Sequence, residues 1–593
     1  MLNTVHLSCD LCVVGGGMSG MAAAISAARE GLKVVLMHER PMLGGNASSE
    51  IRMWICGAHG KDNRETGLLE EISLENMYRN PTKSYAVWDT VLYDFVRREE
   101  NIQLLLNCTC MDAKVDTGTY AHGRDRRIVS VTGYQMTTQR FIEVEAKFFS
   151  DCSGDSILAP LTGAEFRLGR EAASEFGEIS SAEVADKKTM GMSCLVQGRE
   201  THRPVTYTPP EWAVKLNDKH FEHRMPNLRS HSENFWYLEL GGNRDSIGDT
   251  EELRDELVAL AAGTWDYVKN SGNFDAENWD LDFLGFLPGK RESRRMMGQH
   301  ILTQPEISAG TVFDDEVAFG GWPLDDHFPD GFFHRGHPNT NYLTPAPYSI
   351  PYRTLYSKNV DNLFFAGRNI SATHMAMSST RVMATCTLLG EAVGKAAAVA
   401  VQKGITPHDV YAEHCDKLQE KLLNADCFLP SKTRTVSAAC KNADLAGATN
   451  AIRNGQDRAH AIYGTVESDY CHLVPGSSVE YRFNPVNVSC VHLVFSSDLN
   501  RETLEGPVAE RTHTTRANTM LSSPQLRMPA PLCKEFKLLG ELNGEAVELL
   551  HVTNNRKRCY HITPNQTFDK LTLIPISSWG GETIDLISFD FNT

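Results

Sequence analysis

The fold is decided near the start of the chain, where Leu7–Gly20 reads LSCDLCVVGGGMSG. The apolar run that ends at Val14 predicts a β-strand, and the alanine-rich segment Met18–Arg29 predicts a helix. A second apolar run, Leu32–Met37, predicts another strand. Strand, glycine turn, helix and strand in this order form a βαβ unit, from which doubly wound parallel sheets are built. The opening of the sequence therefore predicts an α/β fold.

The turn between this strand and helix has its glycines in the spacing G-x-G-x-x-G. Gly15 permits the tight turn, Gly17 lets a phosphate approach the backbone, and Gly20 lets the helix pack closely on the strand. Ser19 lies at the amino end of the helix, where the positive end of the helix dipole faces a bound pyrophosphate. We therefore expect these four residues to bind a dinucleotide.

An acidic residue stands where the second strand ends. Glu39 follows the last glycine of the turn by about 20 residues, and a carboxylate at that spacing accepts hydrogen bonds from ribose hydroxyls. Such an acid favours an unphosphorylated ribose, which indicates FAD or NAD rather than NADP. The other residues expected beside the dinucleotide follow the ends of predicted strands: Arg40, Gly44, Gly45, Asn46 and Asp155.

The composition narrows the class of protein. The chain has 593 residues, of which 41% are hydrophobic and 22% are charged, as in ordinary soluble globular proteins. A net charge of −17 disfavours nucleic acid and anionic membranes as partners. The sequence has no uninterrupted apolar stretch of roughly 18 residues and no basic signal-peptide region, and its fifteen cysteines, an odd number, suit reduced thiols. We expect a cytoplasmic enzyme with no metal site and no membrane or nucleic-acid partner.

The predicted elements divide the chain into four stretches. Residues 1–160 and 352–430 are expected to form the dinucleotide-binding domain, with a long helix at Val382–Gln402 that stops at Gly404. Residues 161–351 are expected to form an inserted α+β cap, which is rich in tryptophan and histidine. Short strands separated by turn signals predict an all-β jelly-roll sandwich over residues 431–593.

Three segments resemble a known family. They are Gly44–Glu50 (GGNASSE), Pro288–Arg295 (PGKRESRR) and Asn362–His374 (NLFFAGRNISATH). They resemble the FAD-dependent oxidoreductases that have a two-dinucleotide-binding-type flavin domain, distant relatives of the fumarate reductase flavoproteins. The resemblance implies a Rossmann-like domain with FAD as its cofactor and with contacts at Gly367, Arg368 and Met383. Because Gly44–Glu50 contains no histidine or cysteine, we expect the FAD to be bound noncovalently.

The last of these segments suggests how the flavin is held. Arg368 stands where related flavoproteins often carry an acid, which favours a phosphate contact through a cation. Ser378 or Ser379 is expected to cap the helix at Val382–Gln402. The amino end of that helix would then face the pyrimidine edge of the flavin, where negative charge develops on reduction.

Two histidines are candidates for catalysis. The resemblance places His374 beside the flavin ring, where it would accept a hydroxyl proton as hydride leaves the substrate. The alternative is a structural histidine bonded to the backbone. His59 is the second candidate, in a segment with Arg52 and Cys56 that is expected to form a wall of the site.

Three arginines are candidates for binding the substrate. Arg291, Arg294 and Arg295 have the spacing i, i+3, i+4, which would put them on one face of a helix. There they would grip a carboxylate or a phosphate of the substrate. The alternative is a solvated face on which they pair with neighbours such as Glu292.

The final stretch resembles the discoidin-like, galactose-binding-like jelly rolls at Tyr481–Phe483, Val491–Arg501 and Asp585–Phe589. Trp579 with Arg501 would form a sugar platform there, with a buried tryptophan as the alternative. Together with the aromatic cap, this favours a carbohydrate or polyol as the small-molecule substrate, oxidised by hydride transfer to FAD, with an unidentified electron acceptor. Two alternatives stay open: reduction of an activated C=C bond in a carboxylate, and a carbohydrate-binding or scaffold protein with a catalytically silent flavin. A homo-oligomer is among the expected assemblies.

Overall fold

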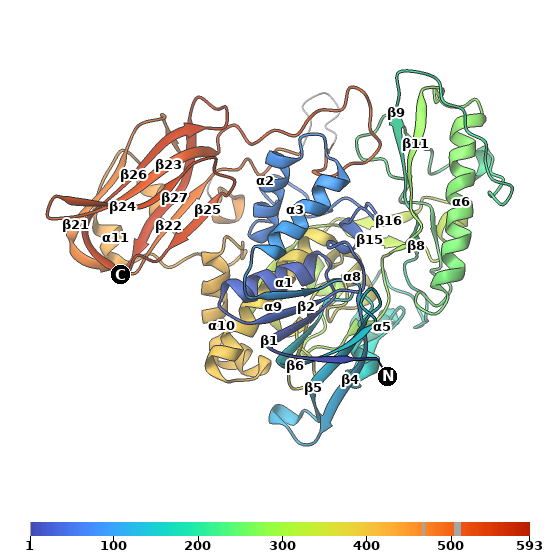
Figure 1. Ribbon diagram of the computed structural model, residues 1–593, viewed down its shortest axis with the longest axis horizontal. Helices are drawn as coiled ribbons and strands as arrows, with labels where there is room; N and C mark the ends of the chain where they lie inside the picture. Colours follow the sequence, from blue (N-terminus) through green and yellow to red (C-terminus); the bar gives the residue numbers. More distant parts are fainter. Residues whose placement is uncertain (1, 465–468, 503–510) are drawn as a thin grey trace. The chain divides into compact units, whose positions relative to one another are not determined.

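The opening segment of the chain forms the centre of a seven-stranded sheet. Its strands are β1 (Thr4–Val14), β2 (Val34–Met37), β3 (Ile102–Leu105), β4 (Cys108–Thr117), β5 (Arg126–Gln135), β6 (Arg140–Asp151) and β18 (Leu363–Phe365). In the computed structural model, which describes residues 2–464, 469–502 and 511–593, the order is β3-β2-β1-β6-β5-β4, and β18 pairs with β6. Figure 1 labels β1, β2, β4, β5 and β6 of this sheet. β1, β2, β3, β6 and β18 run parallel. Their carboxyl ends lie at one edge, because Val14 is level with both Met37 and Asp151.

The helix after the glycine turn is α1 (Met18–Arg29), and it packs along α9 (Met383–Lys403) on the sheet (Figure 1). Small residues make this contact close: a Cβ on Gly390 would lie 2.0 Å from the carbonyl oxygen of Ser19. α9 stops at Gly404, which has φ +69°. Within the described ranges α9 alone is long and apolar enough to cross a membrane, but 94% of that apolar window is buried inside the protein, as in a core helix.

The cap consists of several small sheets around one long helix. Its strands are β7 (Phe166–Arg167), β8 (Met192–Ser193), β9 (Val196–Glu200), β10 (Glu239–Leu240), β11 (Trp279–Leu284), β12 (Gly289–Lys290), β13 (Arg295–Met296), β14 (Glu316–Gly320), β15 (Leu324–His327), β16 (Asn339–Tyr342) and β17 (Tyr348–Pro351). Its helices are α4 (Leu158–Thr162), α5 (Ala173–Phe176), α6 (Thr250–Asn270) and α7 (Gln304–Ser308). Trp265 of α6 and Trp279 of β11 are fully buried in one apolar cluster, which explains the aromatic character of this stretch.

The described residues group into two units whose borders differ from the linear division expected. Unit 1 takes in those of Met1–His59, Thr82–Leu418 and Thr503–Gln525, and unit 2 takes in those of Gly60–Pro81, Gln419–Glu502 and Leu526–Thr593. Unit 2 gains a piece of the N-terminal stretch because Leu74 and Met77 are buried in the core of the sandwich. Unit 1 gains a piece of the C-terminal stretch because Asn518 accepts a hydrogen bond from the Gly198 N–H of β9 (2.8 Å).

Unit 2 is built on two antiparallel sheets. The five-stranded sheet has the order β19 (Asp444–Ala446), β21 (Val479–Val488), β26 (Gln566–Ser578), β23 (Cys533–Leu542), β24 (Glu545–Val552). The four-stranded sheet has the order β20 (Cys471–Leu473), β27 (Ile584–Asn592), β22 (Cys490–Phe495), β25 (Cys559–Ile562). Tyr481, Phe536 and Phe589 lie in the apolar core to which both sheets contribute. The all-β sandwich predicted for the end of the chain is thereby confirmed.

Five further α-helices lie in the described ranges: α2 (Leu68–Arg79), α3 (Tyr85–Arg97), α8 (His374–Thr380), α10 (Pro407–Asn424) and α11 (Ala438–Asn442). In unit 2, α2 carries Glu70, which forms a two-point ion pair with Arg501 (2.8 Å for each contact). Trp579 donates from its indole N–H to the carbonyl of Asn555 (2.7 Å). Arg501 is thus committed to Glu70, and the sugar platform of Trp579 with Arg501 does not form.

Candidate active site

A cavity of about 360 Å³ opens at the carboxyl edge of the parallel strands. Ligands of doubly wound sheets bind at this edge. All but one of the residues predicted to bind the dinucleotide line the cavity. Those that line it are Gly15, Gly17, Ser19, Glu39, Arg40, Gly44, Gly45, Asn46, Asp155, Gly367, Arg368 and Met383. The exception is Gly20, where a Cβ would lie 1.8 Å from the carbonyl oxygen of Gly15. Gly20 therefore serves the packing of the turn.

The glycine turn and the loop after β2 form a cradle without side chains. Gly15 has φ +107° and Gly44 has φ +104°, backbone conformations that favour glycine. A Cβ on Gly45 would lie 3.1 Å from the Cα of Gly17, so these two backbones face each other closely. A pyrophosphate approaches the backbone only where no Cβ stands in its way, and this cradle meets that condition.

Cations surround the cradle. Asp155 pairs with Lys290 (2.8 Å) and with Arg368 (2.6 Å). Burial alone would raise the pKa of Asp155, but these two cations outweigh it and lower that pKa to about 2. Within the described residues, Nε of Arg368 and both Nε and Nη1 of Arg40 are buried and have no hydrogen-bond partner. Guanidinium donors in this condition beside a cavity fit the phosphates of a ligand.

The remaining contacts fit FAD. Glu39 lies at the end of β2, in reach of a ribose, and Val382 and Met383 bring the amino end of α9 to the cavity. The expected cap of α9 was wrong, because Ser378 and Ser379 lie inside a separate helix, α8 (His374–Thr380). α8 has its own cap, in which the hydroxyl of Thr373 accepts from the N–H of Ala376.

Two guanidinium groups form one wall of the cavity. Arg291 donates to the hydroxyl of Ser193 (3.0 Å) and to the carbonyl of Trp236 (2.8 Å). Arg381, at the end of α8, donates to the carboxylate of Asp325 (3.0 Å). Burial and, to a smaller extent, the charge of Arg381 lower the pKa of Arg291. The two cations are therefore close enough to influence each other.

The helix predicted for Arg291, Arg294 and Arg295 was wrong. These residues join β12 to β13 in an extended run, which starts from a pairing of Gly289 with β8. In this conformation Arg291 and Arg294 line the cavity, whereas Arg295 is fully buried away from it and pairs with Glu171 (3.2 Å). Three charged residues at the spacing i, i+3, i+4 are too few to predict a helix, because an extended segment can have the same spacing.

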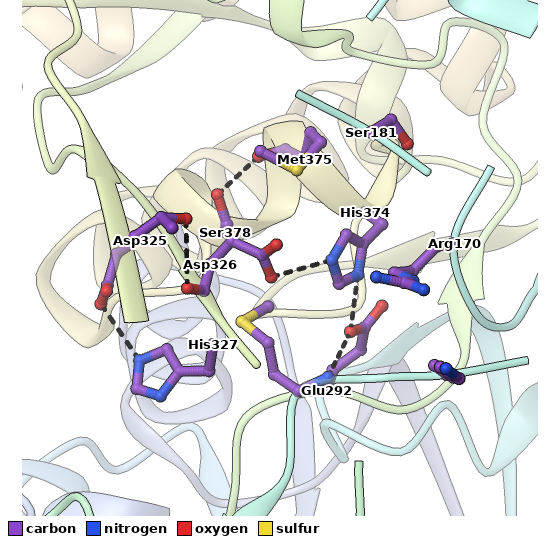
Figure 2. Close-up of polar contacts among 12 residues, drawn as sticks. Arg170, Ser181, Glu292, Asp325, Asp326, His327, His374, Met375 and Ser378 are labelled. Atoms are coloured by element: carbon purple, nitrogen blue, oxygen red, sulfur yellow. Dashed lines mark hydrogen bonds and ion pairs between the residues drawn. The ribbon is translucent and has the colours of Figure 1, made fainter. Parts of the chain in front are cut away.

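His374 lies in an ionic cluster with Glu292 and Asp326 (Figure 2). It is buried and does not line the cavity. Its Nδ1 lies 2.9 Å from Glu292 and its Nε2 lies 3.0 Å from Asp326. Burial opposes the charged form, but the two carboxylates outweigh it and raise the pKa of His374 to about 10. An imidazolium has no lone pair with which to accept a proton. The proton-accepting role predicted for His374 does not fit these surroundings, and its partners are carboxylates rather than the backbone.

The charge on His374 predicts a pH-dependent stability. The raised pKa means that this cluster stabilises the fold fully below about pH 6.5, the ordinary histidine value, and loses that contribution as the pH rises toward about 10. We expect His374→Gln to lower the free energy of unfolding on the order of a few kcal/mol near pH 6 and by much less near pH 10. Urea unfolding of both proteins across this range measures the difference. A pH-independent difference would contradict the assignment, and His300→Gln, at a partly exposed histidine, is the control.

Of the three residues in the segment around His59 that were predicted to form a wall of the site, Cys56 lines the cavity, whereas Arg52 and His59 do not. Trp54 and Cys56 line the cavity, and burial raises the pKa of the Cys56 thiol to about 12. His59 does not line it; its ring packs edge-on against Trp322, and burial lowers its pKa. Arg52 is turned toward Asp282 (3.2 Å). Of the predicted catalytic residues, the structure thus brings Arg291 and Arg294 to the cavity and neither histidine.

Arg381 was missed in the sequence, although a signal for it exists. It is the single charged residue between Asn369 and Gly390, apart from the histidine at position 374. A charge in an otherwise apolar or small-residue run is costly to bury unless it is paired. The pairing here, with Asp325 from β15, depends on the tertiary structure.

Comparisons with solved structures find distant likenesses. A geranylgeranyl bacteriochlorophyll reductase-like protein from Thermoplasma acidophilum is 12% identical, with 71% of this chain and 84% of that chain covered and a TM-score of 0.31. Quinol fumarate reductase FrdA from E. coli is 11% identical, with coverages of 71% and 75% and a TM-score of 0.28. A family 32 carbohydrate-binding module from Streptococcus pneumoniae EndoD is 16% identical, with coverages of 26% and 99% and a TM-score of 0.18. At these scores the likenesses bear on neither substrate nor reaction.

A comparison with curated proteins finds no match. The model of the family described as FAD dependent oxidoreductase matches residues 10–422. This range includes the glycine cradle, the cations around it, and Arg291 and Arg381, which together are called the arginine wall below. The chain therefore belongs to the FAD dependent oxidoreductase family, and it is an oxidoreductase with FAD as its cofactor.

Proposed function

We propose that this enzyme reduces an activated C=C bond in a small carboxylic acid, with the acid held by Arg291 and Arg381. The observation that carries the proposal is the pair of guanidinium groups on one wall of the cavity. Paired guanidinium groups bind carboxylates through several parallel hydrogen bonds, which gives both affinity and orientation. The lining of the cavity also includes the uncharged side chains of Trp54, Ser193 and Leu195.

The arginines are held in place by carboxylates of the protein. Arg291 lies 3.5 Å from Glu239, and Arg381 lies 3.0 Å from Asp325. Nε of Arg381 is buried and has no hydrogen-bond partner within the described ranges. A donor in this state, on a residue that lines the cavity, supports the presence of an anionic ligand there.

Bound FAD supplies a two-electron hydride carrier, and an external reductant supplies the electrons. Arg291 and Arg381 would bind the substrate carboxylate and stabilise the negative charge that spreads onto it as the double bond is reduced. Cys56 keeps its proton at neutral pH, because burial raises its pKa to about 12, and Sγ of Cys56 would give a proton to the substrate carbon. Trp54 would help to keep water out.

The oxidation of a carbohydrate or polyol, expected from the sequence, is the second candidate. The observation that favours it is Trp54, which lines the cavity; one face of its ring stacks on His513, and a sugar would have to stack on the other face. Such an oxidation requires a group that accepts the hydroxyl proton. In the described lining, the carboxylates and histidines are His38, Glu39 and Asp155, which belong to the dinucleotide-binding loops. The described lining thus offers a proton donor, Cys56, but no carboxylate or histidine outside the dinucleotide-binding loops that could accept a proton, and this supports reduction better than oxidation.

The test follows the visible spectrum of the bound flavin under anaerobic conditions. Enzyme reduced with stoichiometric dithionite is mixed with acrylate, crotonate, fumarate or cinnamate, and we expect at least one acid to restore the oxidised flavin bands. The matched amides, acrylamide and crotonamide, should react much more slowly, because they lack the charge. Equal rates of flavin reoxidation by acids and amides, or no reoxidation by any acid, would contradict the proposal. Bleaching of oxidised enzyme by a sugar or polyol would favour the second candidate. The cytoplasmic location and the homo-oligomer stay predictions.

A further inference from the structure

One short strand of the cap supplies two histidine–carboxylate clusters, one on each of its faces. Side chains alternate along a strand, so Asp325 and His327 of β15 share one face and Asp326 takes the other. Asp326 contacts His374, in the cluster already described (Figure 2). Asp325 and His327 instead lie toward the arginine wall, since Asp325 pairs with Arg381. The second cluster has no assigned role.

His327 is the centre of this second cluster. It is 3% exposed, its Nδ1 lies 2.6 Å from Glu239, and its Nε2 lies 3.5 Å from Asp325. Both ring nitrogens therefore face carboxylates, and only an imidazolium can donate from both. Its ring also packs edge-on against Trp236, whose carbonyl accepts from Arg291. His327 thus bridges the two carboxylates that hold the arginine wall.

The charged groups of this second cluster do not sum to zero. Arg291, Arg381 and His327 are positive, and Glu239 and Asp325 are negative. Asp326, a further carboxylate near His327, lies on the opposite face of β15, where His374 is shared between it and Glu292 and where Arg170 also lies near it. The cluster therefore carries one positive charge more than it carries negative charges. Without His327, each arginine would be neutralised by its own carboxylate.

We propose that His327 is a positioning residue, which bridges Glu239 and Asp325 and so leaves the arginine wall with one net positive charge for the carboxylate of the substrate. The bridge acts through the arginines, since His327 itself does not line the cavity. It also sets the specificity, because a neutral wall would lose its preference for acids over amides and polyols. This inference rests on the carboxylate-binding role proposed for Arg291 and Arg381.

The experiment measures the binding of malonate and acetate to oxidised holoenzyme at constant ionic strength, from the shift of the visible flavin bands. Neither acid has a C=C bond, so binding reports on the charge of the wall even if reduction of a double bond fails. We expect His327→Gln to weaken malonate binding about tenfold or more, because the excess charge is lost. Malonamide, which is neutral, should show no such change. His300→Gln, at a histidine–glutamate pair away from the cavity, is the matched control.

A second substitution separates charge from structure. In the double variant E239Q/H327Q one carboxylate is removed along with the imidazolium, so the excess of one positive charge returns, and malonate binding should recover. A residue with only a structural role would not be rescued by a second change in the same core. If His327→Gln does not hold its flavin, Glu239→Gln alone should tighten malonate binding. Unchanged binding in His327→Gln, absence of rescue in the double variant, or weaker binding in Glu239→Gln would each overturn the inference.

Discussion

Replacing Arg291 by glutamine is expected to reduce the rate of flavin reoxidation by unsaturated acids about a thousandfold, while FAD stays bound. Removal of one charged donor that stabilises developing negative charge costs about 10²–10³-fold in rate. The loss should be at the upper end here, because the side chain of Arg291 is only 11% exposed and lines the cavity together with Arg381. Stopped-flow absorbance of dithionite-reduced enzyme mixed with the best acid of the panel measures the rate.

Two further variants test whether the loss of rate comes from the guanidinium group of Arg291. Arg291→Lys keeps the charge but not the planar pair of donors, so it should recover only part of the rate. Arg199→Gln removes a surface arginine that pairs with Asp280 (2.7 Å), and it should behave as wild type. A full rate in Arg291→Gln, with the flavin spectrum intact, would show that the acid binds elsewhere.

Two glycines of the cradle should respond to alanine in opposite ways. Gly20→Ala places a Cβ 1.8 Å from the carbonyl oxygen of Gly15, so the turn must open, and we expect a loss of at least about 3 kcal/mol in the free energy of unfolding. Gly17 has φ −68°, and the nearest atom to a Cβ there is the Cα of Gly45 at 3.8 Å. Gly17→Ala should therefore fold normally and yet bind FAD at least about a hundredfold more weakly, since the methyl group stands where a phosphate approaches.

The two effects are separated by measuring unfolding without FAD and FAD binding by fluorescence quenching. Gly118→Ala is the control, because the nearest neighbour of a Cβ there is the Tyr120 ring at 3.9 Å, far from the cavity. Gly118→Ala should change neither quantity. A Gly17→Ala protein that retains full affinity for FAD would mean that the pyrophosphate does not cross this turn.

The sequence alone was sufficient where a structure is made by neighbouring residues. α1 occupies Met18–Arg29, the predicted bounds, because the pattern that predicts a helix is a local property of the sequence. The cradle belongs to the same class, since Gly15, Gly17 and Glu39 all come from one βαβ unit. A βαβ unit by itself places these residues at the carboxyl edge of its two parallel strands, so their position does not depend on the rest of the chain.

The tertiary structure alone decided the chemistry beyond the cofactor. His327 meets Glu239 across 88 positions of sequence, and His374 meets Glu292 across 82. Neither pair shares an element, so no periodicity or spacing marks it. The same holds for helix α2, whose Leu74 and Met77 belong to the core of a sandwich formed by residues far away in the sequence. Burial makes these long-range pairings necessary, because a charge or an apolar face removed from water must find a partner wherever the fold supplies one. The sequence by itself therefore determined the FAD-binding fold, and the folded chain determined which arginines, carboxylates and histidine form the wall beside it.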